Sequence, residues 1–400
     1  MRPLQIYLLG TGSWFLSFGI QSVMFAWLVT IVLHESPEMV GMAQMSMLVP
    51  AMLLMLVGGS LADHYGGRLI AVIAQTAALV PPLFLLVVVA RNRLSFDAMI
   101  LYAIVMGVAQ AFVTPARDAL LNEVAEGSVQ RTVVRASLTQ FGGQMAGFVI
   151  ASFADSVGAE PIIGLQALVL GLGIVAFYRV RVARTVPAVG TRPIRNLVRS
   201  VREGSRTVFA SRLMRIIVLQ NCAMGICFMG SYIVTIPLLV REVFDGSAAD
   251  LAFINVANSL GLMTTIFILM RFGDIQRKGR ALLLSQGIGA VALGSVGLSL
   301  GFPATLACIY FWGMCGGIAM SMSRTIMQEE APPAQRGRVM GFFSFSFMGS
   351  GPIGALVCGY LVQWLGPETA LVVASFAMLV VMLMVTRFSA LWEPALVTVD

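Results

Sequence analysis

The stretch GSLADHYGGR combines a carboxylate, a glycine pair and a guanidinium between two long apolar runs. Gly66 and Gly67 predict a sharp turn, because glycine accepts positive φ without steric cost. Gly59 lies one helical turn before Asp63 on the same face, where a small residue lets a neighbouring helix approach. At such a contact Asp63 can favour an arginine such as Arg68, or the positive end of a neighbouring helix. The alternative interpretation is an ordinary turn that carries a solvated aspartate.

A second group of charged residues follows the fourth apolar run and recurs in the second half of the chain. Arg117, Glu123 and Arg131 are each matched by the same residue type 207 positions later, and so are Gly142 and Gly147. Contacts that form in one arrangement of the chain and break in another can act as a conformational latch. The candidate latch and coupling residues are Gly59, Asp63, Gly66, Gly67, Arg68, Arg117, Asp118, Glu123, Arg131, Asp274, Arg324, Glu330 and Arg338.

The apolar runs that hold these residues are long enough to cross a membrane. Hydrophobic residues make up 58% of the chain and charged residues only 11%, whereas about 25% charged is usual in soluble proteins. A helix needs roughly 18 or more apolar residues to cross the hydrocarbon, and a barrel would alternate polar and apolar residues instead. We therefore predict an all-α integral membrane protein. Its twelve expected spans are 3–33, 39–62, 69–90, 98–116, 136–154, 161–178, 216–240, 251–270, two within 281–323 divided at Gly301, 339–367 and 369–386.

The basic residues are distributed unevenly between the loops. If the N-terminus is cytoplasmic and the loops alternate sides, all 26 Lys and Arg residues except Arg91, Arg93 and Arg241 fall inside. This bias predicts a multi-pass protein of the bacterial cytoplasmic (inner) membrane with both termini in the cytoplasm. It also accounts for the net charge of +7, so we expect no nucleic acid as a partner. The first run is too long for the apolar core of a cleavable signal peptide.

A basic segment in the middle of the chain separates two sets of six spans. We expect a six-helix half at 1–180, a cytoplasmic linker at 181–215 and a second six-helix half at 216–400. In the linker, Leu197 and Val208 share one helical face and arginines occupy the opposite face. The linker therefore predicts either a helix on the anionic inner leaflet or a solvated helix. Duplicated halves with a substrate path between them are typical of transporters.

GSLADHYGGR resembles the signature loop of the major facilitator superfamily, usually written G-x-L-a-D-r-x-G-r-r. The resemblance covers nearly the whole chain and is closest to the branch that includes the enterobactin exporter and drug-efflux carriers. TPARDALLNEV and APPAQRGRVMGFFSF are similar to the loops after spans four and ten of that branch, and SGPIGALVCGYL is similar to its eleventh span. The resemblance implies the major facilitator fold, with two pseudo-symmetric halves, and a proton-driven carrier with alternating access. It also implies that Asp63 latches the outward-open state.

The chain departs from the family pattern in three places. His64 and Gly67 stand where the family has basic residues, GGQMAG lacks the proline of the fifth-span antiporter motif, and the fourth span lacks an arginine. If transport is proton-coupled, we expect the titrating groups at the cytoplasmic helix ends, on Asp63, Asp118 or Glu123, with His64 as a weaker candidate. The alternative is that these residues only latch the protein, and that transport is uncoupled or driven by the gradient of the substrate.

No charged residue lies deep in any predicted span, although such residues usually mark ion pathways. The polar and aromatic side chains that remain suit a neutral, cationic or aromatic amphiphile better than a sugar or a phosphate. For each of them taken alone, hydrogen bonding between helices is the commoner role. The candidate residues of the substrate cavity are Trp14, Gln21, Gln110, Gln144, Asn221, Tyr232, Asn258, Tyr310 and Trp312.

The chain contains none of the common hydrolase or phosphate-binding motifs, so we expect no enzyme activity. Its five cysteines form no C-x-x-C pair, and we expect neither a metal nor a cofactor. We interpret the protein as a monomeric exporter of a small amphipathic organic molecule, such as a siderophore or a drug. Its expected partners are the lipid bilayer, that substrate and protons. The alternatives are an importer of a small solute, or a membrane sensor or scaffold that transports nothing.

Overall fold

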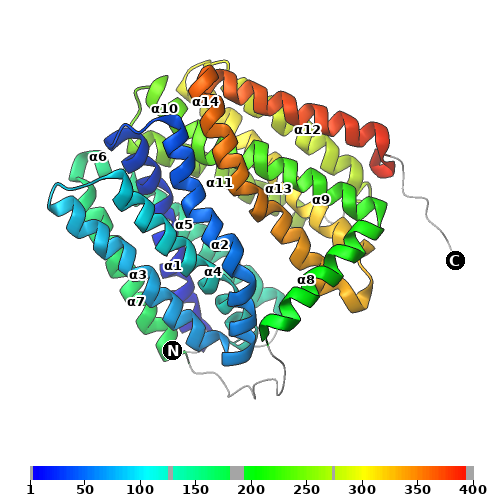
Figure 1. Cartoon of the computed structure of the whole chain (residues 1–400), viewed down its shortest axis with the longest axis horizontal. Coiled ribbons are helices and arrows are strands. Elements are labelled where there is room, and N and C mark those ends of the chain that lie inside the picture. The colour runs from blue at the N-terminus through cyan, green and yellow to red at the C-terminus, as the bar shows by residue number, and fades with distance from the viewer. Residues whose placement is uncertain (1–2, 125–128, 181–192, 273–274, 393–400) are drawn as a thin grey trace. The chain divides into compact units, whose positions relative to one another are not determined.

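The computed structural model describes residues 3–124, 129–180, 193–272 and 275–392, which are almost entirely helical (Figure 1). The helices before the linker are α1 (Pro3–Trp27, continued by the π-helical turn η1, Leu28–Val32), α2 (Pro37–Tyr65), α3 (Gly67–Ala90), α4 (Phe96–Val124), α5 (Val129–Ala151), α6 (Ala154–Val157) and α7 (Ala159–Arg179). The later elements are α8 (Pro193–Ala210), α9 (Arg212–Met224), the π-helical turns η2 (Gly225–Met229) and η3 (Ser231–Thr235), α10 (Ile236–Glu242), α11 (Ala248–Phe272), α12 (Lys278–Val296), α13 (Phe302–Glu330), the 3₁₀ turn η4 (Pro333–Gln335), α14 (Arg336–Phe388) and the 3₁₀ turn η5 (Ala390–Trp392).

Ten helices of the described chain are long and apolar enough to cross a membrane. One of them, α14, has 53 residues and bends at Gly366, where φ is 76°, so it holds both of the last two expected spans. The expected break at Gly301 is also present, because φ is 96° there and α13 begins at the next residue. α5 lies at the expected fifth span but carries Arg131 and Arg135 and is not among the ten. The all-α membrane architecture is thus confirmed. Hydropathy identifies ten helices of the described chain, one of which, α14, holds two expected spans.

The chain forms two compact units. Unit 1 comprises Met1–Val198 and Asp245–Val256, and unit 2 comprises Arg199–Phe244 and Ala257–Asp400. The division falls inside α8, and the first turns of α11 group with unit 1. The expected boundaries at 180 and 215 are the ends of the basic segment in the sequence. The two units are defined by the packing of the helices, so their boundaries fall elsewhere.

The helices of unit 1 approach one another most closely at glycines. A Cβ atom on Gly147 of α5 would lie 2.8 Å from the Cα of Gly19 and 2.8 Å from the amide nitrogen of Ile20, both on α1. It would also collide with the carbonyl oxygen of Leu16. Contacts this short involve the backbone, which cannot move aside as a side chain does, so only glycine fits at this crossing. The small-residue spacing of Gly143 and Gly147 therefore reflects helix packing.

Buried glutamines join helices that are far apart in the sequence. In unit 1, the side-chain amide of Gln75 donates to the Ser13 hydroxyl and to the carbonyl of Leu170, both at 3.1 Å. In unit 2, Gln220 of α9 donates to the side chain of Gln286 of α12. Within an apolar environment such bonds satisfy polar groups that would otherwise be costly to bury. These glutamines are a framework of the units and were not among the residues singled out from the sequence.

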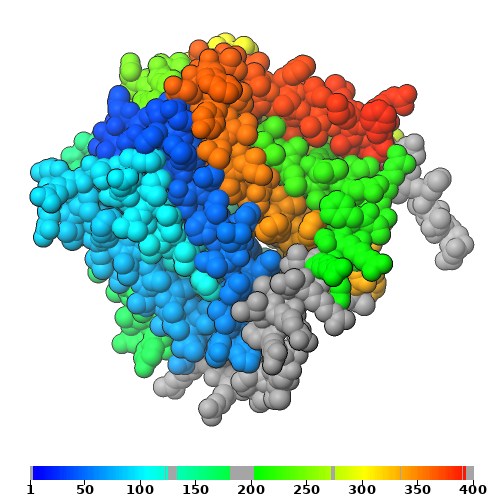
Figure 2. Space-filling view, in the orientation of Figure 1, coloured from blue at the N-terminus to red at the C-terminus, as the bar shows by residue number. Residues whose placement is uncertain are grey.

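The linker helix α8 packs against the start of α14 within unit 2. Glu203 forms an ion pair with Arg338, and a Cβ atom on Gly204 would lie 2.8 Å from the carbonyl oxygen of Arg338. Val208 is fully buried, while the green surface of α8 remains visible in the space-filling view (Figure 2). Part of the apolar face that we expected on a leaflet or in solvent is therefore covered by protein. The side chains of that face before residue 202 lie outside the described residues.

Candidate functional site

The turn between α2 and α3 is held against α4 by its two glycines. Gly66 has φ 91° and ψ 141°, a conformation that other residues adopt only with strain. A Cβ atom on Gly67 would lie 2.6 Å from the carbonyl oxygen of Ala116 and 2.7 Å from the amide nitrogen of Leu120. A buried apolar cluster at this end of unit 1 fixes the turn further. Its members include Tyr7, Ala62, Ile70, Ala116, Leu120, Phe177 and Val180.

The close approach that we expected at Gly59 occurs one residue earlier. A Cβ atom on Gly59 would make only an ordinary contact, 3.8 Å from the Cβ of Pro115. On Gly58 it would collide with the carbonyl oxygen of Ala111 and lie 3.1 Å from the Cα of Phe112. The one-residue shift follows from the rotation of α2, which turns Gly58 and not Gly59 towards α4.

Asp63 stands exposed in the last turn of α2. Among the residues that the structure describes, its carboxylate forms no hydrogen bond and no ion pair. The C-terminal end of a helix carries a partial negative charge, so a carboxylate there is unfavourable unless a positive group approaches it. Arg68, the expected partner, is directed elsewhere: it donates to the carbonyl oxygen of Val180 at 3.2 Å and lies 5.9 Å from the ring centre of Tyr178. The expected pair of Asp63 and Arg68 is therefore absent from the described arrangement.

Arg117 is a buried cation near the end of α4. The residue is 7% exposed, and its guanidinium lies 4.4 Å from the ring centre of Phe15 and 3.6 Å from the carboxylate of Asp118. Asp118 itself has a side chain that is 67% exposed. One terminal nitrogen of Arg117, Nη1, is buried without a hydrogen-bond partner in the described chain. A buried donor left unpaired is costly, so Arg117 has unused capacity to bind an acceptor.

The remaining latch candidates differ in their burial and in their partners. Glu123 is half-buried in α4, Arg324 is exposed on α13, and Glu330 accepts a hydrogen bond from the Ser211 hydroxyl at 3.1 Å. Arg338 pairs with Glu203, as described above. Arg131 lies in α5, but its side chain falls outside the described residues, as does the whole of Asp274. The two copies of the repeat thus differ in environment, because Arg117 is buried whereas Arg324 is exposed.

The cavity candidates of unit 1 include two glutamines whose amides are unused. Trp14 and Gln21 of α1 are both buried, and the Gln21 amide donates to the sulfur of Met47 at 3.0 Å. Gln110 of α4 and Gln144 of α5 are half-buried. In the part of the chain that the structure describes, neither of their side chains makes a hydrogen bond. Gln110 and Gln144 can therefore both donate to and accept from a bound molecule.

The cavity candidates of unit 2 divide into packing residues and an aromatic group. Asn221 donates to the carbonyl of Phe343 at 3.1 Å and to the Ser346 hydroxyl at 2.9 Å, and Tyr310 donates to the Thr264 hydroxyl at 3.0 Å. These contacts join helices, so Asn221 and Tyr310 serve packing. Asn258 is half-buried, and the described chain offers its side chain no hydrogen bond.

An aromatic group surrounds Trp312 of α13. Its ring centre lies 5.8 Å from that of Tyr232 and 5.7 Å from that of Phe228, which it meets edge-on. Phe228 was not singled out from the sequence. It is positioned by η2, a π-helical turn that interrupts the seventh span, Arg212–Glu242. Such turns inside α-helices are frequent at functional sites, and only the glycines Gly225 and Gly230 hint at this one in the sequence.

The arrangement offers uncharged groups to a ligand and no metal centre. The described residues contain no cluster of three His, Cys, Asp or Glu side chains that could hold a metal ion. What they do contain is aromatic surface and unused amides within each unit. Such a set binds rings and hydrogen-bonding groups rather than a bare ion.

Known proteins resemble this chain in sequence and in fold. The model of the Major Facilitator Superfamily matches residues 7–355. The enterobactin exporter EntS of Shigella flexneri is 23% identical over 189 residues, which is 47% of this chain and 44% of that protein. EntS of Escherichia coli O9:H4 (strain HS) is 24% identical over 189 residues, covering 47% of this chain and 45% of that protein. The match thus spans less than half the length of these relatives.

Solved structures of transporters share the fold. The nucleoside transporter NupG superposes with a TM-score of 0.75 at 13% identity, covering 98% of this chain and 100% of that one. A POT family transporter in complex with 5-aminolevulinic acid gives a TM-score of 0.75 at 12% identity, covering 98% and 96%. The family model matches most of the chain, and the membrane helices are those of this fold. The chain therefore belongs to the Major Facilitator Superfamily of membrane transporters.

Proposed function

We propose that the protein is a secondary active exporter of a small amphipathic organic molecule, of the siderophore or drug class, that works by alternating access and is coupled to protons. The observation that carries this proposal is the similarity to enterobactin exporters, which also supports export as the direction. The proposed location is the bacterial cytoplasmic membrane, with both termini in the cytoplasm. An importer, the alternative from the sequence, would give the opposite flux.

The uncharged site residues support a substrate with rings and polar groups. Tyr232 and Trp312, of which Trp312 is 6% exposed in the described arrangement, carry aromatic faces that prefer offset or edge-on partners. Gln110, Gln144 and Asn258 offer amides that are unused in the described chain. Within unit 2, a molecule with aromatic rings and hydrogen-bonding groups suits Trp312, Tyr232 and Asn258, whereas a small inorganic ion does not.

The position of Asp63 supports proton coupling. Its charge is unfavourable at the end of α2, and protonation removes that charge. A proton can bias a conformational equilibrium only if it binds two states with different affinity. We infer that a second state offers Asp63 a positive partner, which the described arrangement does not, because Arg68 donates to the carbonyl oxygen of Val180 instead.

The direction of transport is tested by flux measurements. We expect deletion of the gene to raise the intracellular amount of a siderophore, or the retention of a lipophilic cationic dye, and we expect the restored gene to reverse this. In proteoliposomes an imposed pH gradient should drive uphill movement of the same compound. A deletion strain that instead fails to accumulate a nutrient would establish import, and purified protein with no flux of either compound would contradict the proposal.

Replacing Trp312 by alanine should lower the transport rate at limiting substrate by about tenfold, equivalent to ~1.4 kcal/mol of lost binding. The reason is the loss of the aromatic surface that it forms with Tyr232 and Phe228. Trp364→Ala is the control for loss of a tryptophan outside this group, because Trp364 lies on α14 and is 76% exposed, whereas Trp312 is 6% exposed. Trp312→Phe should keep most of the rate, which separates a binding role from a loss of folded protein. Equal rates for the alanine variants at Trp312 and Trp364 would exclude this site.

The membrane orientation is tested by reporter fusions. We expect a fusion after Arg93, in the turn between α3 and α4, to report the outside of the cell. A fusion after Arg199, in the linker helix, should report the cytoplasm, because positively charged loops are retained there. The same side for both fusions would contradict two halves of six spans.

A further inference from the structure

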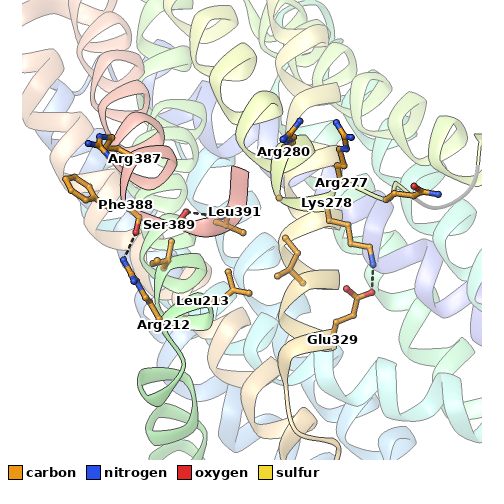
Figure 3. A pocket seen from close by; sticks show the side chains of 14 residues that line it. Arg212, Leu213, Arg277, Lys278, Arg280, Glu329, Arg387, Phe388, Ser389 and Leu391 are labelled. Atoms are coloured by element: carbon orange, nitrogen blue, oxygen red, sulfur yellow. Dashed lines mark hydrogen bonds and ion pairs between the residues drawn. The ribbon is translucent and has the colours of Figure 1, made fainter. Parts of the chain in front are cut away.

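Unit 2 contains a pocket of ≈ 790 Å³ with a strongly basic lining (Figure 3). It lies where α9 and α12 begin and where α13 and α14 end, so four helix ends surround it. Figure 3 shows Arg212 and Arg387 on one side and Arg277, Lys278 and Arg280 on the other. Glu329 is the single acidic residue of the lining. The volume is in the range of small-molecule sites, roughly 300–1,000 Å³.

Specific contacts hold the end of the described chain, η5 and the last turn of α14, at the edge of the pocket. A Cβ atom on Gly279 would collide with the carbonyl oxygen of Leu391, so the glycine lets η5 lie against the first turn of α12. Arg280 donates to the carbonyl of Trp392 at 2.6 Å, and Arg212 donates to the carbonyl of Phe388 at 2.9 Å. These bonds satisfy carbonyls at the end of α14 and in η5 but leave both guanidinium charges uncompensated.

The positive charge of the pocket exceeds what its own residues neutralise. Lys278 forms an ion pair with Glu329, which compensates one of the five cations. Arg277 and Arg387 have no hydrogen bond and no ion pair with any residue that the structure describes. Guanidinium groups bind phosphate oxygens through paired N–H donors, which makes Arg suited to phosphate recognition.

The rest of the lining is mostly apolar, which favours some phosphate compounds over others. It consists of Leu213, Ile216, Ile326, Phe388 and Leu391, together with Gln276, Gly279 and Ser389. Phe388 is 67% exposed, at the end of a membrane span. A free phosphate gains nothing from these side chains, whereas a phosphate ester with hydrocarbon chains can place its chains along them. Basic pockets between membrane helices are known to favour anionic lipid headgroups.

We propose that this pocket binds an anionic phospholipid, with its headgroup phosphate among the basic side chains that include Arg277 and Arg387, and its acyl chains along the apolar side that ends at Phe388. The occupant ties the start of α12 to the end of α14, so binding stabilises unit 2. This site is separate from the residues proposed for substrate binding, and it would operate in an exporter or an importer alike.

The test uses the purified full chain in detergent and follows its thermal denaturation with added lipid. Phosphatidylglycerol should raise the midpoint temperature, and phosphatidylcholine with the same acyl chains should raise it much less. In the double variant Arg277→Gln/Arg387→Gln the phosphatidylglycerol concentration for half of the effect should rise about thirtyfold, as the loss of two cations near a lipid phosphate predicts. Arg277→Lys/Arg387→Lys should restore most of the effect, because the charge is kept.

The control variant is Arg91→Gln/Arg93→Gln, which removes two exposed arginines from the turn after α3 in unit 1. It should leave the phosphatidylglycerol dependence unchanged. An equal loss in both double variants, or no loss in either, would overturn the proposal. Glycerol 3-phosphate, which carries the phosphate without acyl chains, should not stabilise the protein. If it matches phosphatidylglycerol, the pocket binds a soluble phosphate compound and the lipid assignment is wrong.

Discussion

Replacing Gly147 by valine should lower the free energy of unfolding by about 3 kcal/mol, at the upper end of what an overpacked interior costs. The added Cβ atom would lie 2.8 Å from the Cα of Gly19 and would collide with the backbone of Leu16. Neither atom can move without separating α1 from α5. The expected observations are a much lower yield of folded protein and a lower midpoint of thermal denaturation in detergent.

Gly142→Val is the matched control for this experiment. Gly142 lies on the same helix, α5, and a Cβ atom there has no neighbour within 4 Å. The change in helix propensity is the same at both positions, so it cancels in the comparison. Similar denaturation midpoints for the two variants would contradict this prediction. They would mean that α1 and α5 can separate far enough to admit a valine side chain at position 147.

Neutralising Asp63 should have the largest effect on energised transport. We expect Asp63→Asn to lower pH-gradient-driven accumulation in proteoliposomes by about tenfold, which corresponds to losing one charge-assisted hydrogen bond of ~1.5 kcal/mol. Exchange of labelled for unlabelled substrate at equal concentrations should continue, since it needs no proton bias. Asp118→Asn and Glu123→Gln test the other two candidate carboxylates in the same assay.

Asp97→Asn is the control, because Asp97 is also exposed but lies at the opposite end of α4, in its first turn. Full uphill transport in Asp63→Asn, Asp118→Asn and Glu123→Gln would show that none of these carboxylates couples the proton. A variant that loses both accumulation and exchange would point to a latch that the whole transport cycle requires.

The sequence predicts the membrane spans well because hydropathy depends on composition alone. The runs 39–62 and 69–90 lie within α2 and α3, and the turn between them falls at Gly66, where the sequence placed it. The sequence predicts less well which side of a helix faces its neighbour. Successive residues of a helix differ by about 100° in direction, so an error of one residue selects a different contact. The close contact at Gly58 rather than Gly59 shows the size of that error, which is one residue.

The environment of polar side chains could not be predicted from residue type and spacing. Arg117 and Arg324 occupy corresponding places in the repeat, yet the first is buried and the second exposed. The sequence marks Asn221 and Asn258 equally as cavity candidates. In the structure, however, the side-chain amide of Asn221 already donates to Phe343 and Ser346 of α14. Each outcome depends on which acceptor the opposite helix presents, which no local pattern records.

The π-helical turns η2 and η3 change the register of the seventh span. A π-turn closes its hydrogen bond between residues five apart rather than four, so each turn takes up about one additional residue, and one residue corresponds to ~100° of rotation in an α-helix. Tyr232 follows η2, and a helical wheel drawn from Arg212 therefore places it on the wrong face. Aligning this span with a relative that lacks both turns needs a one-residue gap at each of η2 and η3, and residues transferred without these gaps would be assigned to neighbouring side chains.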